Sequence, residues 1–261
     1  MNTSTSDKRY INEAIILLKS SFKMNIDRKF SPVLTDFADV ESEEFRHYVS
    51  NEYIASHTGL INKKSTLPGP LNIIIEEMSQ GEVEGMEIRY SFMLTPFGTI
   101  LLASTNKGIC RISFVDKPQD AINDLKLRFA GAVFKRSTDE LQKAFKTVFY
   151  KKLGSLTQIR LHLQGSEFQL KVWKYIVDIP VGWFVTYEEI ATAIGQPTAT
   201  QAVGTAVGSN PVAMVIPCHR VVPKSGGVGN YHYGKLHKMT LIAWESFLIN
   251  RKCYTEGNEK E

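Results

Sequence analysis

Three neighbouring residues, Cys218, His219 and Arg220, place a thiol, an imidazole and a guanidinium side by side. A cysteine is a strong nucleophile only as its thiolate, and a neighbouring base or positive charge makes the thiolate accessible near neutral pH. A buried structural cysteine needs no such neighbours, and free cysteine is among the most buried residue types. The triplet is therefore a candidate nucleophilic site, with an ordinary buried thiol as the alternative.

The residues on both sides of this triplet are typical of a DNA-binding unit. Two short helices are expected upstream, one opening at Thr186 and one from Thr198 to Val207, joined by the turn 195–197. Such a pair has the dimensions of a helix-turn-helix. A glycine-rich loop, 226–231, follows downstream. A reactive thiol between these features suggests chemistry performed on nucleic acid.

The composition is that of a soluble globular protein long enough for two or three small domains. Of the 261 residues, 43% are hydrophobic and 22% are charged, and the net charge of +4 is compatible with nucleic-acid binding without requiring it. Cys110, Cys218 and Cys253 form neither a disulfide framework nor a zinc spacing, so we expect reduced thiols and no metal site. Because no signal core or membrane-spanning apolar run is present, we expect a cytoplasmic protein.

The elements that must position these residues predict an α+β protein in three parts. Residues 1–84 form a helical segment, with an amphipathic helix at 8–22, short helices between 34 and 54, a linker at 63–71 and a helix over 71–78. Residues 86–163 form an α+β subdomain. Its elements are strands at 87–94, 99–103 and 109–114 in an antiparallel meander, helices at 118–129 and 139–151, and a strand at 158–163.

Residues 164–250 are predicted to be mostly helical, followed by a tail at 251–261. A first helix carries Val172 and Trp173 on its apolar face, and Thr186 with Glu189 forms a capping-box pattern that opens the second. A final amphipathic helix at 236–248 carries Glu245.

An ordered series of short motifs resembles the O6-alkylguanine-DNA alkyltransferase family over residues 86–250. Order and spacing are preserved across the series, which makes the resemblance specific. The motifs are Gly165-Ser166-Glu167-Phe168-Gln169, Val172-Trp173, Ile179-Pro180-Val181-Gly182, Thr186-Tyr187, Ala202-Val203-Gly204, Asn210-Pro211, Pro217-Cys218-His219-Arg220, Gly229-Asn230-Tyr231 and Ala243-Trp244-Glu245.

The resemblance implies a methylated-DNA–protein-cysteine S-methyltransferase that repairs DNA. Such a protein moves an alkyl group from O6-alkylguanine, with O4-alkylthymine as a further candidate substrate, onto its own cysteine and is consumed. It implies Cys218 as the acceptor, His219 as a general base acting through a water molecule, and Glu245 as the carboxylate that orients the imidazole. A solvated Glu245 is the alternative. No cofactor is expected, because DNA is the alkyl donor.

The O6 atom lies inside a stacked duplex, so the nucleotide must be flipped into a pocket. The resemblance implies that Tyr187 contacts the flipped nucleotide and polarises the base, with core packing of its ring as the alternative. It also implies that backbone groups of Cys218 and Val221 recognise the base edge. Gly229, Tyr231 and His232 would line the loop that covers the base.

The second helix of the helix-turn-helix carries small residues, among them Thr200, Ala202 and Gly204. Long bidentate readers such as arginine and asparagine, expected for major-groove specificity, are absent, and small side chains allow close approach to a minor groove. A tightly packed internal helix is the alternative. Gln201 stands where the family usually has an arginine that intercalates in place of the flipped base, and this predicts weaker duplex affinity or slower flipping.

The resemblance further implies DNA contacts by Asn210 and Arg220, a ribonuclease H-like sheet before a winged helix-turn-helix domain, and a monomer acting on double-stranded DNA without a membrane. Residues 1–84 weakly resemble a degenerate AraC-type module. This segment contains no cysteine, which excludes a metal-dependent methylphosphotriester sensor. A non-catalytic lesion-binding protein and an alkylation-responsive transcriptional regulator are the competing functions.

Overall fold

A computed structural model describes residues 42–59, 72–146 and 158–257 of the chain. They divide into two compact units, each made of separate stretches of sequence. We call residues 72–146, 158–178 and 205–218 the sheet unit, and residues 42–59, 179–204 and 219–257 the helical unit. Within the described ranges, no helix combines the length and apolar character that a membrane span requires.

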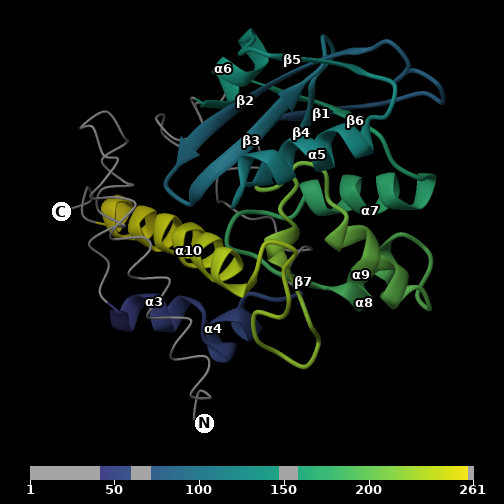
Figure 1. The fold of residues 1–261 in the computed structure, drawn as a ribbon. Helices are drawn as coiled ribbons and strands as arrows, with labels where there is room; N and C mark the ends of the chain where they lie inside the picture. Colours follow the sequence, from purple (N-terminus) through teal and green to yellow (C-terminus); the bar gives the residue numbers. More distant parts are fainter. Residues whose placement is uncertain (1–41, 60–71, 147–157, 258–261) are drawn as a thin grey trace. The chain divides into compact units, whose positions relative to one another are not determined.

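The sheet unit is built on six strands (Figure 1) in the order β1-β6-β4-β3-β2-β5. The meander of β2, β3 and β4 is antiparallel, whereas β1, β5 and β6 join by parallel pairing. The strands are β1 (Ile73–Glu77), β2 (Glu87–Thr95), β3 (Gly98–Ser104), β4 (Ile109–Phe114), β5 (Val133–Arg136) and β6 (Ile159–Leu163).

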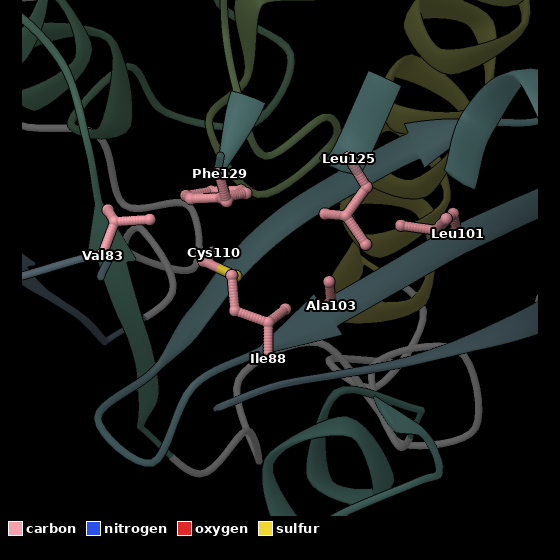
Figure 2. Packing of buried hydrophobic residues seen from close by; sticks show 7 residues of the cluster. All are labelled: Val83, Ile88, Leu101, Ala103, Cys110, Leu125 and Phe129. Carbon is pink, nitrogen blue, oxygen red and sulfur yellow. The ribbon is translucent and has the colours of Figure 1, made fainter. Parts of the chain in front are cut away.

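Helix α5 (Pro118–Arg128) covers one face of this sheet. Leu125 and Phe129 pack there with Cys110 in a fully apolar cluster, shown in Figure 2, whose other members are Val83, Ile88, Leu101 and Ala103. Helix α6 (Glu140–Lys146) covers the opposite face, because Gln142 bonds the hydroxyls of Ser91 and Ser104, which alternate with the cluster residues along β2 and β3.

Helix α7 (Glu167–Val177) and the segment 205–218 complete the sheet unit. Ser166 and Gln169 form a capping box that begins α7. Trp173 is buried and donates its indole N–H to the carbonyl of Ala206 at 2.8 Å. The segment is also tied to β4, since Ile112 forms a parallel bridge with Val212. These contacts fix the chain that leads into Cys218.

The remaining elements lie wholly or partly in the helical unit, and Figure 1 labels its helices and β7. Strand β7 runs straight into α8 and pairs in parallel with β8. Helix α9 begins in this unit and ends in the sheet unit. The elements are α3 (Ser42–Tyr48), α4 (Asn51–Ser56), β7 (Val185–Thr186), α8 (Tyr187–Ala193), α9 (Thr200–Gly208), the 3-10 turn η2 (Cys218–Arg220), β8 (Val221–Val222) and α10 (Lys235–Gly257).

Most of the predicted elements are confirmed, including the meander, the short helices before 59 and the Thr186–Glu189 capping box. The helix predicted over 71–78 is wrong, because residues 73–77 form β1. Three consecutive isoleucines favour a strand, and they pair with β6 from a distant part of the chain. The predicted helix at 8–22 and linker at 63–71 lie outside the described residues. The predicted domain boundaries stay a prediction.

Candidate active site

Cys218 lies at the end of a tight turn in the sheet unit. Its backbone N–H donates to the carbonyl of Ile216 at 2.8 Å, and its side chain is only 5% exposed. Met214, four residues earlier, has a φ of +70°, a left-handed conformation that non-glycine residues seldom adopt. Such local strain persists only where surrounding contacts hold it. The turn is therefore a fixed platform for the thiol.

Asn210 supplies the contacts that hold this platform. Its amide Nδ2 donates to the sulfur of Cys218 at 2.9 Å and to the carbonyl of Ile216 at 2.8 Å. Its Oδ1 accepts the N–H of Val212 at 2.9 Å. An N–H aimed at sulfur favours the thiolate over the thiol. Asn210 therefore lies directly against the cysteine turn, and its predicted DNA contact stays a prediction.

His219, the next residue along the chain, belongs to the helical unit and is 1% exposed. Its Nε2 lies 2.9 Å from Oε1 of Glu245 on α10, which is itself 4% exposed. Because a carboxylate only accepts hydrogen bonds, the hydrogen of the neutral imidazole is on Nε2. Its Nδ1 has no hydrogen-bond partner among the described residues and is the atom available to accept a proton.

The electrostatics of this pair favour a neutral base. Burial lowers the pKa of His219 below its ordinary 6.5, and Glu245 only partly opposes that effect. Burial alone would raise the pKa of Glu245, but the charges and hydrogen bonds of Arg220 and His219 together outweigh it and hold that pKa well below its usual range. The site thus contains an uncharged imidazole beside a permanently ionised carboxylate.

Arg220 has a different position from the one its predicted role requires. Its Nε and Nη2 donate to the two carboxylate oxygens of Glu245 at 2.9 and 2.8 Å, and Nη1 donates to the carbonyl of Ile179. The guanidinium is buried and occupied by these internal bonds. Arg220 therefore neutralises Glu245, and its guanidinium is not placed to contact DNA.

Tyr187 is the first residue of α8, and its ring lies against α9. A Cβ placed on Gly204 would be 3.9 Å from the ring, an ordinary van der Waals contact. Thr200, Gln201 and Ala202 are exposed at the start of α9. The alternative of a fully internal helix is therefore excluded.

The glycine-rich loop after β8 contains the predicted base-covering residues. Tyr231 is half-buried and His232 is exposed, while Gly229 has a φ of +72° and would place a Cβ 2.8 Å from Pro223.

Lys238 on α10 is fully buried, and the sequence did not predict a role for it. Its Nζ donates to the carbonyl of Val221 at 2.6 Å and lies 3.4 Å from that of Asn230. The one clue to this role in the sequence is that Lys238 stands on an otherwise apolar face of its helix.

Two family models match this chain. The ribonuclease-like domain of 6-O-methylguanine DNA methyltransferase covers residues 88–153, and the DNA-binding domain of the same protein covers residues 167–247. The methylated-DNA–protein-cysteine methyltransferase of Mycolicibacterium paratuberculosis is 38% identical over 164 residues, which are 60% of this chain and 92% of that protein. The chain belongs to the 6-O-methylguanine DNA methyltransferase family.

Other members of the 6-O-methylguanine DNA methyltransferase family differ in length. The regulatory protein ada of Salmonella typhimurium is 34% identical over 170 residues, 62% of this chain. This chain covers 47% of that protein, so it spans about half of its length. The crystal structure of Mycobacterium tuberculosis OGT in complex with DNA matches with a TM-score of 0.50 and 28% identity, over 60% of this chain and 92% of that chain. The predicted family and fold class are confirmed.

The second described cysteine has none of these features of the 6-O-methylguanine DNA methyltransferase site. Cys110 lies inside the apolar cluster (Figure 2), where burial raises its pKa to about 12. Among the described residues no group of histidine, cysteine, aspartate and glutamate is arranged to hold a metal ion. Cys218 is therefore the described thiol equipped for chemistry.

Proposed function

We propose that this chain repairs DNA by moving a methyl or larger alkyl group from O6-alkylguanine to Cys218 in a single turnover. The observation that carries this proposal is the environment of Cys218. An amide N–H is aimed at the sulfur, and the next residue is a neutral histidine fixed by a buried carboxylate. An ordinary core thiol such as Cys110 has no hydrogen-bonding side chain of this kind in its cluster.

The proposed step is one displacement. His219 accepts the thiol proton at Nδ1 through a water molecule, and the sulfur attacks the alkyl carbon. The carbon–O6 bond breaks as the sulfur–carbon bond forms, and its electron pair goes to O6 of the departing guanine. The Tyr187 hydroxyl donates a hydrogen bond that stabilises this anion before the base regains a proton. Because a thioether is stable, each protein molecule acts once.

Delivery of the base is proposed to use the exposed start of α9 and the loop after β8. The small residues Thr200 and Ala202 allow close approach to the minor groove, and Gln201 fills the gap left by the flipped nucleotide. Gly229, Tyr231 and His232 cover the base, and backbone groups of Cys218 and Val221 recognise its edge. No cofactor takes part, because the alkyl donor is DNA.

We further propose that the protein acts as a monomer in the cytoplasm, where thiols are kept reduced. Residues 86–163 and 164–250 correspond in this proposal to the two domains of the family. A reduced environment is required, because an oxidised Cys218 could not accept an alkyl group.

A repair assay tests the proposal. A duplex with one O6-methylguanine is incubated with increasing amounts of protein, and restored guanine is measured at completion. The expected plateau is one guanine per protein molecule, with none for Cys218→Ala. Repair that continues beyond one equivalent would contradict single-turnover transfer. Binding without repair would instead identify a lesion-binding protein.

A further inference from the structure

Residues 42–59 lie outside both segments that match the family models, yet they are built into the helical unit. Their apolar side chains are buried, namely Phe45, Tyr48, Val49, Tyr53 and Ile54. Helix α3 contacts α10, and Figure 1 shows α3 and α4 alongside that helix. We call residues 42–59 the brace.

The end of the brace pairs with the chain that leads into Tyr187. The N–H of Phe184 donates to the carbonyl of His57 at 2.9 Å, and the N–H of Gly59 donates to the carbonyl of Phe184 at 3.2 Å. Thr58 and Phe184 form a parallel bridge directly before β7. The brace thus extends the small β7–β8 sheet by one more backbone connection.

Aromatic contacts fix this end of the brace in one orientation. The His57 ring stacks on Tyr53 with a centroid distance of 4.2 Å and lies 5.5 Å from the ring of Trp183. Its Nδ1 is also 2.9 Å from the carbonyl of Tyr53. The residues on both sides of the Phe184 pairing are therefore held by ring contacts as well as by backbone bonds.

Two side-chain contacts connect the brace to proposed substrate-handling elements. A Cβ on Gly59 would lie 2.9 Å from Oε1 of Glu189, whose Oε2 caps α8 through Thr186. A Cβ on Gly227, in the loop after β8, would lie 3.1 Å from Oδ1 of Asn51. Both glycines are closely approached, so the brace lies directly against the cap of α8 and against the base-covering loop.

We infer that the brace is a positioning element of the alkyl-transfer site, which holds the Tyr187-bearing start of α8 and the loop at 223–234 in place. This inference rests on the proposed function for the reaction that it serves. The brace contributes no group to the displacement itself. It acts through the residues that it contacts, namely Glu189, Phe184 and Gly227.

The test compares Gly59→Ala with Gly81→Ala in the full chain. Gly59 and Gly81 have φ values of +77° and +81°, so a Cβ strains both backbones, but nothing lies within 4 Å of a Cβ at Gly81. The rate of methyl transfer to Cys218 is measured with saturating duplex and with free O6-methylguanine, which needs no extrusion from a duplex. The apparent Kd for the duplex is measured separately. Amide hydrogen exchange is followed over residues 184–190 and 223–234.

Gly59→Ala is expected to slow methyl transfer to Cys218 by about fivefold, both from saturating duplex and from the free base, the factor that corresponds to a lost helix cap. Amide exchange in both segments should accelerate in Gly59→Ala, with little change in apparent Kd. Gly81→Ala should change neither the transfer rate nor the exchange in these segments. Equal behaviour of the two variants would overturn the inference. If Gly59→Ala does not fold, Asn51→Ala is compared with Glu52→Ala, its exposed neighbour, by exchange at 223–234.

A wild-type protein that transfers no methyl group would overturn the proposed function alone. The exchange comparison would then still decide whether the brace holds α8 and the loop, because it does not depend on the reaction.

Discussion

Glu245 is a buried carboxylate shared by two side chains with different tasks. Arg220 binds both of its oxygens, and His219 binds one of them. A buried carboxylate without a partner costs several kcal/mol, so the guanidinium is what allows the charge to stay in the interior. Because Arg220 already neutralises Glu245, His219 can stay uncharged and act as a base near neutral pH.

The pH dependence of alkyl transfer follows from this arrangement. The pKa of His219 is lowered below 6.5, so the neutral imidazole is the main form at neutral pH and becomes protonated as the solution becomes acidic. We expect a rate constant that is flat through neutrality and falls on an acid limb below 6.5. A limb centred above 6.5 in single-turnover measurements would contradict a neutral buried His219.

The same groups predict how stability changes with pH. The folded-state pKa values of His219 and Glu245 both lie below their ordinary values, so the unfolded chain binds more protons in acid. Their contribution to the free energy of unfolding is full at neutral pH. It declines below about 6.5 for the imidazole and below about 4.5 for the carboxyl. This contribution is measured by urea unfolding of the wild type and of Glu245→Gln across this pH range. The same pH dependence of the free energy of unfolding in both proteins would contradict the prediction.

Asn210 offers a third prediction at the scale of single residues. Asn210→Asp keeps the oxygen that accepts from Val212 but replaces the N–H aimed at sulfur by a negative charge. Loss of a hydrogen bond to a charged group costs about 1.5–3 kcal/mol, so transfer should slow by at least about tenfold. Asn106→Asp, at an exposed turn of the same unit, is the control. Unchanged transfer in Asn210→Asp would remove Asn210 from the mechanism.

At the scale of elements, the proposed mechanism divides the handling of DNA between α8 and α9. The capping box fixes the start of α8 and therefore Tyr187, while α9 exposes Thr200, Gln201 and Ala202. Gln201 fills space and forms hydrogen bonds but has no positive charge near the phosphate backbone. Phosphate neutralisation dominates affinity for duplex DNA. The proposed mechanism thus predicts a weakness in delivery of the base and none in the chemistry of Cys218.

Gln201→Arg tests this division. The variant should bind duplex more tightly and repair faster at limiting DNA, with a steeper loss of affinity as salt increases. At saturating DNA its transfer rate should rise only if flipping limits the wild type. Ala193→Arg adds the same charge on the exposed part of α8 and is the control. Equal gains in both variants would assign the effect to net charge and reject a specific role for position 201.

The sequence predicted the elements whose signals are local. The alternating pattern of β2, the turns of the meander and the capping box of α8 each need only a few neighbouring residues. Strand β1 escaped prediction, because a short apolar run reads equally as helix and its partner β6 is far along the chain. In the site, Cys218 and His219 were found from their adjacency. The Arg220–Glu245 and Lys238–Val221 contacts were not, since no spacing rule links them.

At the scale of the whole molecule, the compact units do not follow the order of the chain. Cys218 ends a stretch of the sheet unit and His219 begins a stretch of the helical unit, so the nucleophile and its base are joined by one peptide bond. The brace adds an N-terminal stretch to the helical unit. The two described cysteines also differ, one in an apolar cluster and one beside a hydrogen-bonding amide.

The central claim is that the alkyl group ends on the sulfur of Cys218, and mass spectrometry after exposure to O6-methylguanine duplex tests it most directly. The intact protein should gain the mass of one methylene unit, and peptide mapping should place it on the peptide containing Cys218. The peptides containing Cys110 and Cys253 should stay unmodified, and Cys218→Ala should gain nothing. A methyl group on another residue, or no gain with excess damaged duplex, would contradict the account.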